Sequence, residues 1–170
     1  MPTPPKVIFR QPKNLQSLIV RAKVSSRSTP VVHRGTFKTH ARNCVTCSAL
    51  RETTHVVSHT TGERFHLNTT STTCTTKEVI YLINCLDCGK QYVGETGSEL
   101  KVRHRGHRQE FRKCHTPLGF HFQTCQRCEL IGLQNLTNST KQNREEAELK
   151  WIYRLKTYAP LGINVKDMRH

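Results

Sequence analysis

Hydrophobic and polar positions along the chain predict three strands, all after residue 77. The stretch EVIYLINC (78–85) is rich in β-branched and aromatic residues, which is typical of a strand buried on both faces. KQYVGET (90–96) and LIGLQNL (130–136) predict two further strands. The turn residues of CLDCGK favour a hairpin or a cysteine knuckle between the first two strands.

A first helix is predicted directly after the second strand. Ser98 can cap a helix that begins at Glu99 and runs through ELKVRHRGHRQEFRKC, before HTPLGF breaks it. Leu100, Arg103 and His107 share one face of that helix because residues three and four apart are neighbours.

A second helix is predicted near the end of the chain. It runs from Lys141 to about Lys156, with Asn138 or Ser139 as its cap. YAPLGIN ends it through its Pro and Gly.

Composition divides the chain into three regions. Residues 1–36 contain Pro, Ser and Arg and one amphipathic piece, NLQSLIVRAKV, which is too short to be stable alone. Residues 37–76 open with a cysteine pair in HARNCVTC and are then rich in Thr, Ser and His, so a small metal-held hairpin would fit there. Residues 77–170 contain the predicted strands and helices.

The charge of the chain favours nucleic acid as a partner. Lys and Arg number 27 against 12 Asp and Glu, a formal net charge of +15, and such a surplus attracts polyanions. Residues 1–47 hold nine of these bases and no acid. No apolar run approaches the ~20 residues of a spanning helix, and the N-terminus lacks the apolar stretch of a secretory signal. We therefore expect an intracellular protein with no membrane partner.

Cysteine spacing points to structural zinc. Three C-x-x-C pairs are present, and the other two cysteines stand apart: the eight are Cys44, Cys47, Cys74, Cys85, Cys88, Cys114, Cys125 and Cys128. A secreted chain would form disulfides, but inside a cell such pairs near histidines favour zinc, because two thiolates three positions apart can occupy neighbouring corners of a tetrahedron. The unpaired Cys114 is expected to be a free thiol or a core residue.

A first zinc site is expected in residues 37–76. Its ligands would be Cys44, Cys47, Cys74 and His40, with His55, His59 and His66 as rivals for the fourth position. The alternative is a degenerate connector that binds no metal.

The order of the motifs resembles the GIY-YIG nuclease family. VIY corresponds to the first motif, YVG to the second, ETGSELKVRHRGH to the arginine helix, and EEAELKWIYRLKTYAPLGIN to the glutamate helix with its closing asparagine. Val79 stands where the first motif usually has Gly, at a strand position that is not a reacting group.

Within that family, the chain is most similar to the endonuclease domain of Penelope-like retroelements, in which a cysteine pair also lies between the two tyrosine motifs. The segments VIFRQPKNLQSLIVRAKV and CVTC resemble the end of the reverse-transcriptase region and the connector of such elements. The resemblance implies a small α/β domain at residues 77–170, with a three-stranded antiparallel sheet flanked by helices, preceded by a zinc-bound connector.

The resemblance also implies a metal-dependent DNA endonuclease that nicks its substrate. Glu148 would hold Mg²⁺ or Mn²⁺, with Glu145 as a rival one turn earlier, and Arg103 would clamp the phosphate. Arg105 is a neighbour that faces elsewhere on the helix. Tyr81 and Tyr92 would orient the attacking water. Gly94 would let the backbone approach closely beside the second tyrosine, and Asn164 would support the site by hydrogen bonding.

The resemblance implies a second zinc site as well. Cys85 and Cys88 would be joined by His121, and His107, Cys125 and Cys128 compete for the fourth position, with Cys128 the predicted ligand. His107 can instead serve the catalytic side, one turn from Arg103.

The expected partner is DNA, with RNA or a reverse-transcriptase partner as further candidates, and the expected location is the nucleus. The alternative function is a catalytically decayed, zinc-stabilised module that binds nucleic acid. A transcription-type zinc finger is disfavoured, because no cysteine pair is followed by a helix with H-x-x-x-H spacing.

Overall fold

The computed structural model describes residues 34–39, 42–67 and 71–166. All of them belong to one compact unit, residues 32–170. The amphipathic piece NLQSLIVRAKV and His40 lie outside the described residues.

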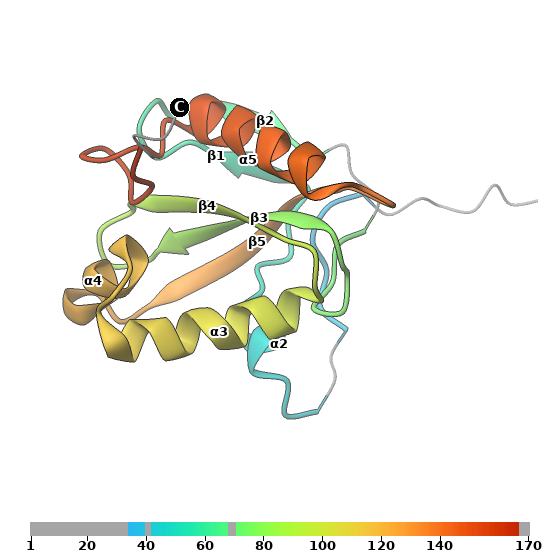
Figure 1. Cartoon of the computed structure of the whole chain (residues 1–170), viewed down its shortest axis with the longest axis horizontal. Helices are drawn as coiled ribbons and strands as arrows, with labels where there is room; N and C mark the ends of the chain where they lie inside the picture. Colours follow the sequence, from blue (N-terminus) through green and yellow to red (C-terminus); the bar gives the residue numbers. More distant parts are fainter. Residues whose placement is uncertain (1–33, 40–41, 68–70, 167–170) are drawn as a thin grey trace, which may run out of the picture. The chain divides into compact units, whose positions relative to one another are not determined.

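The centre of the unit is an antiparallel sheet of three strands in the order β4-β3-β5 (Figure 1). The strands are β3 (Val79–Cys85), β4 (Gln91–Thr96) and β5 (Cys128–Asn135). β3 is in the middle and buried almost throughout, as its apolar sequence predicts. The predicted three-stranded antiparallel sheet is therefore present, with β5 beginning two residues earlier than the apolar run LIGLQNL.

Alternate residues of β3 pack against opposite layers of helices. Val79, Tyr81 and Ile83 share a core with residues of α3 (Leu100–Lys113) and α4 (Pro117–Thr124). Ile80 and Leu82 share a second core with α5 (Lys141–Leu155). Figure 1 shows α3 and α4 on one face of the sheet and α5 on the other, the arrangement that a strand with period-two side chains requires.

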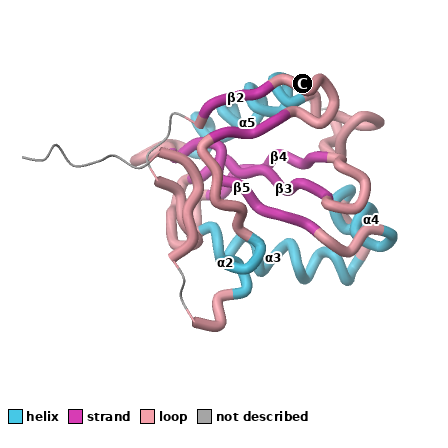
Figure 2. The backbone as a smooth tube through the Cα atoms, turned by 180° about the vertical axis from the view of Figure 1, so that it is seen from behind, coloured by secondary structure: helices cyan, strands magenta, loops and turns pink. Residues whose placement is uncertain are grey.

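The segment before the sheet adds a short helix, α2 (Val45–Ala49), and a hairpin of β1 (His55–Val57) with β2 (Arg64–His66). The hairpin is held by apolar packing, because Val56 and Leu67 are buried in the core that contains α5 and the Phe65 ring meets Trp151 edge-on at 6.2 Å. In addition, Ser58 Oγ donates to the carbonyl of Leu155 at 2.8 Å. Figure 2 shows β2 along α5 and α2 beside α3.

The starts of the helices differ from the sequence prediction. Glu99, and not Ser98, is the N-cap of α3, and it makes no side-chain capping bond. Thr140 caps α5 by accepting from the Asn143 N–H at 3.2 Å, one residue beyond Ser139.

α4 was not predicted. HTPLGF ends α3, but Thr116 then accepts from the Gly119 N–H at 3.0 Å and Pro117 occupies the first turn, where its missing N–H costs nothing.

Candidate active site and metal centres

Tyr81 is the buried centre of the predicted catalytic residues. Its side chain is 0 % exposed, and its hydroxyl contacts two groups of α3. Arg103 Nε donates to the phenolic oxygen at 3.0 Å, and Nε2 of His107 lies 2.6 Å from the same oxygen. Because the oxygen already accepts from Arg103, the phenolic proton is left to donate to His107. Burial, and to a lesser degree the neighbouring Tyr92, raise the pKa of Tyr81 well above its usual range, so the phenol is neutral.

His107 is held as a neutral imidazole of defined tautomer. Its Nδ1 lies 2.9 Å from a carboxylate oxygen of Glu110, one turn along α3, and a carboxylate only accepts, so Nδ1 carries the proton. Burial, with the charge of Arg103, lowers the pKa of His107 to about 4, although Glu110 acts in the opposite direction. Nε2 is therefore free to accept from Tyr81. Glu110 also lies 3.7 Å from a terminal nitrogen of Arg103.

The second tyrosine lies beside the first. Tyr92 faces Ile83 and Gly94 faces Tyr81 in the β3–β4 register, so the two tyrosines are diagonal neighbours on one face of the sheet. Both rings meet the imidazole of His107 edge-on, at 5.6 Å for Tyr81 and 5.8 Å for Tyr92. Burial and then the charge of Glu148 raise the pKa of Tyr92 to about 12.

Gly94 leaves the space that the Tyr81 hydroxyl occupies. A Cβ at this position would lie 2.5 Å from the Tyr81 oxygen and 2.6 Å from its ring carbon Cζ. Any larger residue would therefore displace the phenol from Arg103 and His107.

Glu148 contributes an unpaired carboxylate from α5. It forms no hydrogen bond or ion pair with any other residue in the described part of the chain. Burial, followed by the charge of Glu95, raises its pKa to about 7, and Arg103 partly opposes the shift. The rival, Glu145, is exposed and lies 3.4 Å from Lys141. Of the two, Glu148 is the carboxylate whose charge interacts with Arg103 and both tyrosines.

Asn164 holds the edge strand next to both motif positions. Its Oδ1 accepts from the N–H of Val93 at 2.9 Å and its Nδ2 donates to the carbonyl of Val93 at 2.8 Å. Val93 lies between Tyr92 and Gly94, and β4 is an edge strand, so these bonds satisfy backbone groups that the sheet does not pair. Asn164 thereby positions the strand that carries Tyr92.

Of the predicted catalytic residues, Tyr81, Tyr92, Gly94 and Arg103 lie together, and two further residues of α3 join them. Asn164 is bound to the strand beside them, and Glu148 on α5 is linked to them through its charge. His107 was predicted only as one of two alternatives, a zinc ligand or a catalytic-side residue, and Glu110 was not predicted. The spacing of Arg103, His107 and Glu110 along one helix face is the sequence signal that could have found the set.

A four-residue metal cluster connects the β3–β4 turn to the end of α4. Cys85, Cys88, His121 and Cys125 place their ligand atoms within 4.8 Å of one another. Cys88 Sγ lies 3.5 Å from Nε2 of His121. Tetrahedral zinc with bonds of about 2.0–2.3 Å separates its ligand atoms by roughly 3.3–3.8 Å, and three thiolates with an imidazole are a ligand set that zinc takes. Burial and the charge of Lys90 lower the pKa of His121, which favours the neutral imidazole that binds metal.

The fourth member of this cluster is Cys125, and the prediction of Cys128 is wrong in this respect. Cys125 is the C-cap of α4, four residues after His121, so both lie at the same end of the helix. Cys128 is the first residue of β5 and pairs with Cys85 across the sheet. Cys85 belongs to the ligand group although it is also a strand residue, but the thiol of Cys128 is absent from the group found in the described part of the chain. His107, another rival, is engaged with Tyr81.

Asp87 supports the same metal cluster. Its carboxylate accepts from the backbone N–H groups of Gln126 and Arg127 at 2.7 and 2.9 Å, and from Nε of Arg127 at 2.7 Å. These hydrogen bonds lower the pKa of Asp87 to about 2. The turn that contains Cys88 is thus tied to the segment after Cys125, which supports the ligand set from outside.

The first predicted zinc site appears as a cluster of three thiols. Cys44, Cys47 and Cys74 lie within 4.8 Å of one another, with 3.5 Å between the sulfurs of Cys47 and Cys74. The hydroxyl of Thr39 lies 3.2 Å from Cys47 Sγ and 3.4 Å from Cys74 Sγ. Burial opposes ionisation of Cys47, but hydrogen bonds from Thr39 and Cys44 lower its pKa to about 7. These thiols can hold a structural metal such as zinc.

The described residues do not include a fourth ligand for that cluster. His40 lies outside them, next to Thr39 in the chain. The rivals His55, His59 and His66 are absent from the group of ligand atoms found in the described part of the chain. Cys114 is a free, partly buried thiol that caps α3 in the left-handed conformation.

The described helices include none that is long and apolar enough to cross a membrane. In the comparisons with known proteins, no family model, no curated protein and no solved structure matches the chain. What is established is a mixed α/β unit with small antiparallel sheets, one Cys/His cluster and one cluster of three cysteines, both able to hold a metal such as zinc.

Proposed function

We propose that this protein is a metal-dependent endonuclease that nicks DNA, of the GIY-YIG type found in Penelope-like retroelements. The observation that carries the proposal is the meeting of Tyr81, Arg103 and His107 by hydrogen bonds, with Glu148 brought from a distant helix into the same electrostatic environment. Neutral phenols, a fixed arginine and an unpaired carboxylate are the groups that phosphodiester hydrolysis uses.

Arg103 supplies charge for the phosphate. Its Nε is fixed on Tyr81, and the guanidinium has further N–H donors that can bind phosphate oxygens, so the charge is held in place before the substrate arrives. Such preorganised charge is the largest usual contribution to stabilising the developing oxyanion.

Tyr81 and His107 would manage the proton of the attacking water. Tyr81 would take the proton of the attacking water as it passed its own hydroxyl proton to Nε2 of His107, and Glu110 would orient the imidazole and stabilise the imidazolium that forms. Tyr92 would line the other side of this position, against the same imidazole. Because burial strongly opposes a tyrosinate, phenol deprotonation would require an added positive charge nearby.

Glu148 fits a hard divalent cation. Its carboxylate is unpaired among the described residues, and burial, followed by the charge of Glu95, raises its pKa, so a bound cation would favour the ionised form. Oxygen ligands suit Mg²⁺ or Mn²⁺, and such an ion would supply charge neutralisation at the phosphate. The two cysteine clusters would instead hold zinc in structural roles, one clipping the connector and one pinning the β3–β4 turn to α4.

A second candidate is a zinc-stabilised DNA-binding module without catalysis. The net charge of +15 favours it equally, because phosphate binding needs no active site. In either case we propose DNA as the partner and the nucleus as the location, with RNA or a reverse transcriptase as further partners of a retroelement protein.

Relaxation of supercoiled plasmid distinguishes the two functions. The zinc-loaded protein should convert supercoiled DNA to open circles when Mg²⁺ or Mn²⁺ is added, and the Glu148→Gln variant should bind DNA without cutting it. Binding without nicking in any divalent metal would support the binding module and overturn the nuclease. Nicking that survives Glu148→Gln would overturn the assignment of the site.

A further inference from the structure

Helix α3 presents two chemically different faces. At 100° per residue, Arg103, His107 and Glu110 lie within about 60° of one another and face Tyr81. Four other basic residues of the helix lie on the opposite side, about 140–200° from Arg103; they are Lys101, Arg105, Arg108 and Arg112. The proposed catalytic site accounts for the first face only.

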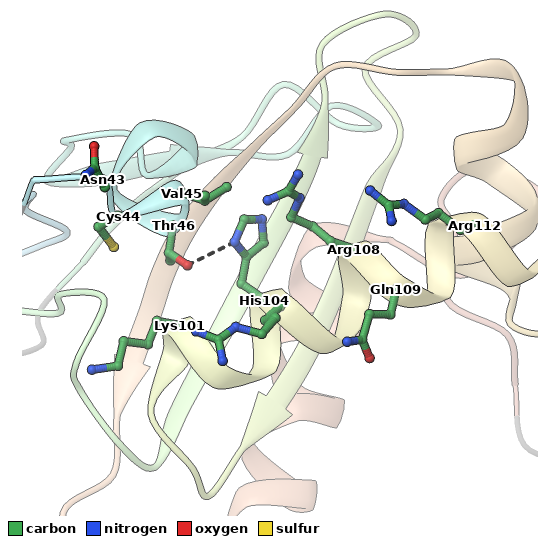
Figure 3. Close-up of a pocket in the computed structure, with 10 residues that line it drawn as sticks. Asn43, Cys44, Val45, Thr46, Lys101, His104, Arg108, Gln109 and Arg112 are labelled. Carbon is green, nitrogen blue, oxygen red and sulfur yellow. Dashed lines mark hydrogen bonds between the residues drawn. The ribbon is translucent and has the colours of Figure 1, made fainter.

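The basic face forms one wall of a groove. A cavity of about 280 Å³ lies between residues 43–46, at the start of α2, and α3. Figure 3 shows Arg108, Gln109 and Arg112 along the helix, with Val45 and Thr46 across from them. Thr46 Oγ and Nδ1 of His104 lie 3.0 Å apart, so a hydrogen bond connects the two walls.

The groove is positive and is not neutralised from within. Within the described residues, no carboxylate lines it. Lys101 is paired with Glu99 at 2.8 Å, but the three arginines form no ion pair with the described carboxylates. Burial and the charge of Arg108 lower the pKa of His104 to about 4, so the imidazole adds no charge. Three solvent-exposed guanidinium groups are thus free to bind an anion.

The spacing of the arginines suits a phosphodiester backbone. Arg105 and Arg112 are separated by seven residues, or roughly 10 Å along the helix. One strand of duplex DNA carries a phosphate for about every 3.4 Å of its axis, and neighbouring phosphates lie farther apart than this along the winding backbone, so the arginines reach about two to three phosphates. A single small anion would engage only one end of the groove.

We propose that the groove between α2 and α3 binds the phosphate backbone of duplex DNA, at a surface separate from the catalytic site. The choice of DNA rests on the proposed function, whereas the phosphate chemistry rests on the groove itself. Because the two faces lie on opposite sides of a helix about 10–12 Å wide, the groove holds a DNA segment other than the phosphate being cut. One wall of that surface carries Cys44, so the metal-binding connector takes part in it.

The test compares the DNA affinity of two charge variants of the full chain. The groove variant is Arg105→Gln/Arg108→Gln/Arg112→Gln. The matched control removes the same charge from exposed residues of β2 and α5 and just after α5: Arg64→Gln/Lys150→Gln/Lys156→Gln. Both are made in zinc-loaded protein carrying Glu148→Gln, and fluorescence anisotropy with a labelled 20-base-pair duplex is measured without Mg²⁺ at several salt concentrations.

The groove variant should bind at least tenfold more weakly at 0.1 M salt. The slope of log affinity against log salt should become shallower by about 2–3, since each phosphate contact contributes about 0.9. The control should change the slope by less than about 1. Equal losses of DNA affinity in the two variants would overturn the proposal. So would a groove variant that loses affinity for a duplex RNA of the same length but not for the DNA. Polyglutamate that displaces the labelled duplex as well as unlabelled DNA does would also overturn it and would indicate an acidic protein as the partner.

The outcome is distinct from that of the nuclease proposal. If the wild-type chain never nicks DNA but the groove variant loses affinity as described, the groove assignment stands alone. If nicking is found and the two charge variants bind alike, only the groove assignment fails.

Discussion

The phenolic oxygen of Tyr81 lies 2.6 Å from Nε2 of His107, in a buried position where both groups are neutral. The imidazole is in turn fixed by Glu110, so the phenolic proton has one defined acceptor. This pair joins the central strand of the sheet to α3 and is the point around which Arg103, Tyr92 and Gly94 are arranged.

Removal of His107 should slow nicking with little effect on DNA affinity. His107→Ala takes away the acceptor of the Tyr81 proton, and loss of a positioned acid or base usually costs about 10²–10⁴-fold in rate. His104→Ala is the control for the loss of a buried histidine of α3. Because the hydrogen bond of His104 to Thr46 connects the walls of the groove, nicking is compared at saturating protein. Plasmid nicking rates and melting temperatures of both variants check this. Equal rate losses in the two variants would show that only stability had changed.

Gly94→Ala should displace the Tyr81 phenol and reduce nicking by about 100-fold, since a misplacement of about 1 Å can have an effect of this size. The new Cβ would lie 2.5 Å from the Tyr81 oxygen, and such overpacking should also cost about 1–3 kcal/mol of stability. Gly106→Ala is the contrast, because nothing lies within 4 Å of its added Cβ.

Gly106→Ala should therefore stabilise α3 by up to about 1 kcal/mol and leave nicking unchanged. Chemical denaturation and nicking of both variants provide the measurement. An active Gly94→Ala protein would contradict the position assigned to Tyr81.

Glu148→Gln should stabilise the protein at pH 8 when no divalent metal is present. The folded-state pKa of Glu148 is raised from 4.5 to about 7, so the native state retains a proton that the unfolded state loses. Between these values, stability falls as pH rises, and above pH 7 the loss is complete. The neutral amide of Glu148→Gln avoids that loss, so the free energy of unfolding of the variant at pH 8 should exceed that of the wild type by about 1–3 kcal/mol.

Melting temperatures at pH 4.5 and pH 8 test this. We expect Glu148→Gln to melt at a higher temperature than the wild type at pH 8, and this difference should shrink toward pH 4.5. Added Mg²⁺ should raise the melting temperature of the wild type more than that of the variant. A gain independent of pH would contradict an ionised, unpaired Glu148.

Zinc content should distinguish Cys125 from Cys128. Cys125→Ser removes a member of the four-residue cluster, so the variant should lose one zinc ion per chain or bind it at least tenfold more weakly. Cys128→Ser leaves the cluster intact. Metal analysis after dialysis against a weak chelator gives the comparison. Loss of zinc from the Cys128 variant alone would restore the ligand set predicted from sequence.

The sheet and the long helices follow from local patterns. VIYLINC is apolar at nearly every position, and its short length with β-branched and aromatic residues favours a strand covered on both faces, so β3 was predictable without tertiary information. α4 was not, because its eight residues hold Pro and Gly and have a weak periodic signal. It forms because Thr116 caps it and because Leu118 and Phe122 pack into the core with Tyr81.

The candidate site was predictable only as a set of motifs. A motif gives Tyr81, Arg103 and Glu148 in order along the chain, but the contact between Tyr81 and His107 depends on the register of β3 against α3. The choice of Cys125 over Cys128 likewise depends on where α4 ends and β5 begins. Both are tertiary outcomes that residue spacing alone leaves open.

The most direct measurement of the central claim is the nicking rate of supercoiled plasmid at saturating Mg²⁺ for the wild type, Glu148→Gln and Glu145→Gln side by side. Glu145 lies one turn earlier on α5, exposed and paired with Lys141, and is the matched control. We predict open circles from the wild type and from Glu145→Gln at similar rates, and a loss of at least 100-fold for Glu148→Gln with DNA affinity retained. Equal rates for all three proteins, or no nicking by the wild type in any divalent metal, would contradict the account.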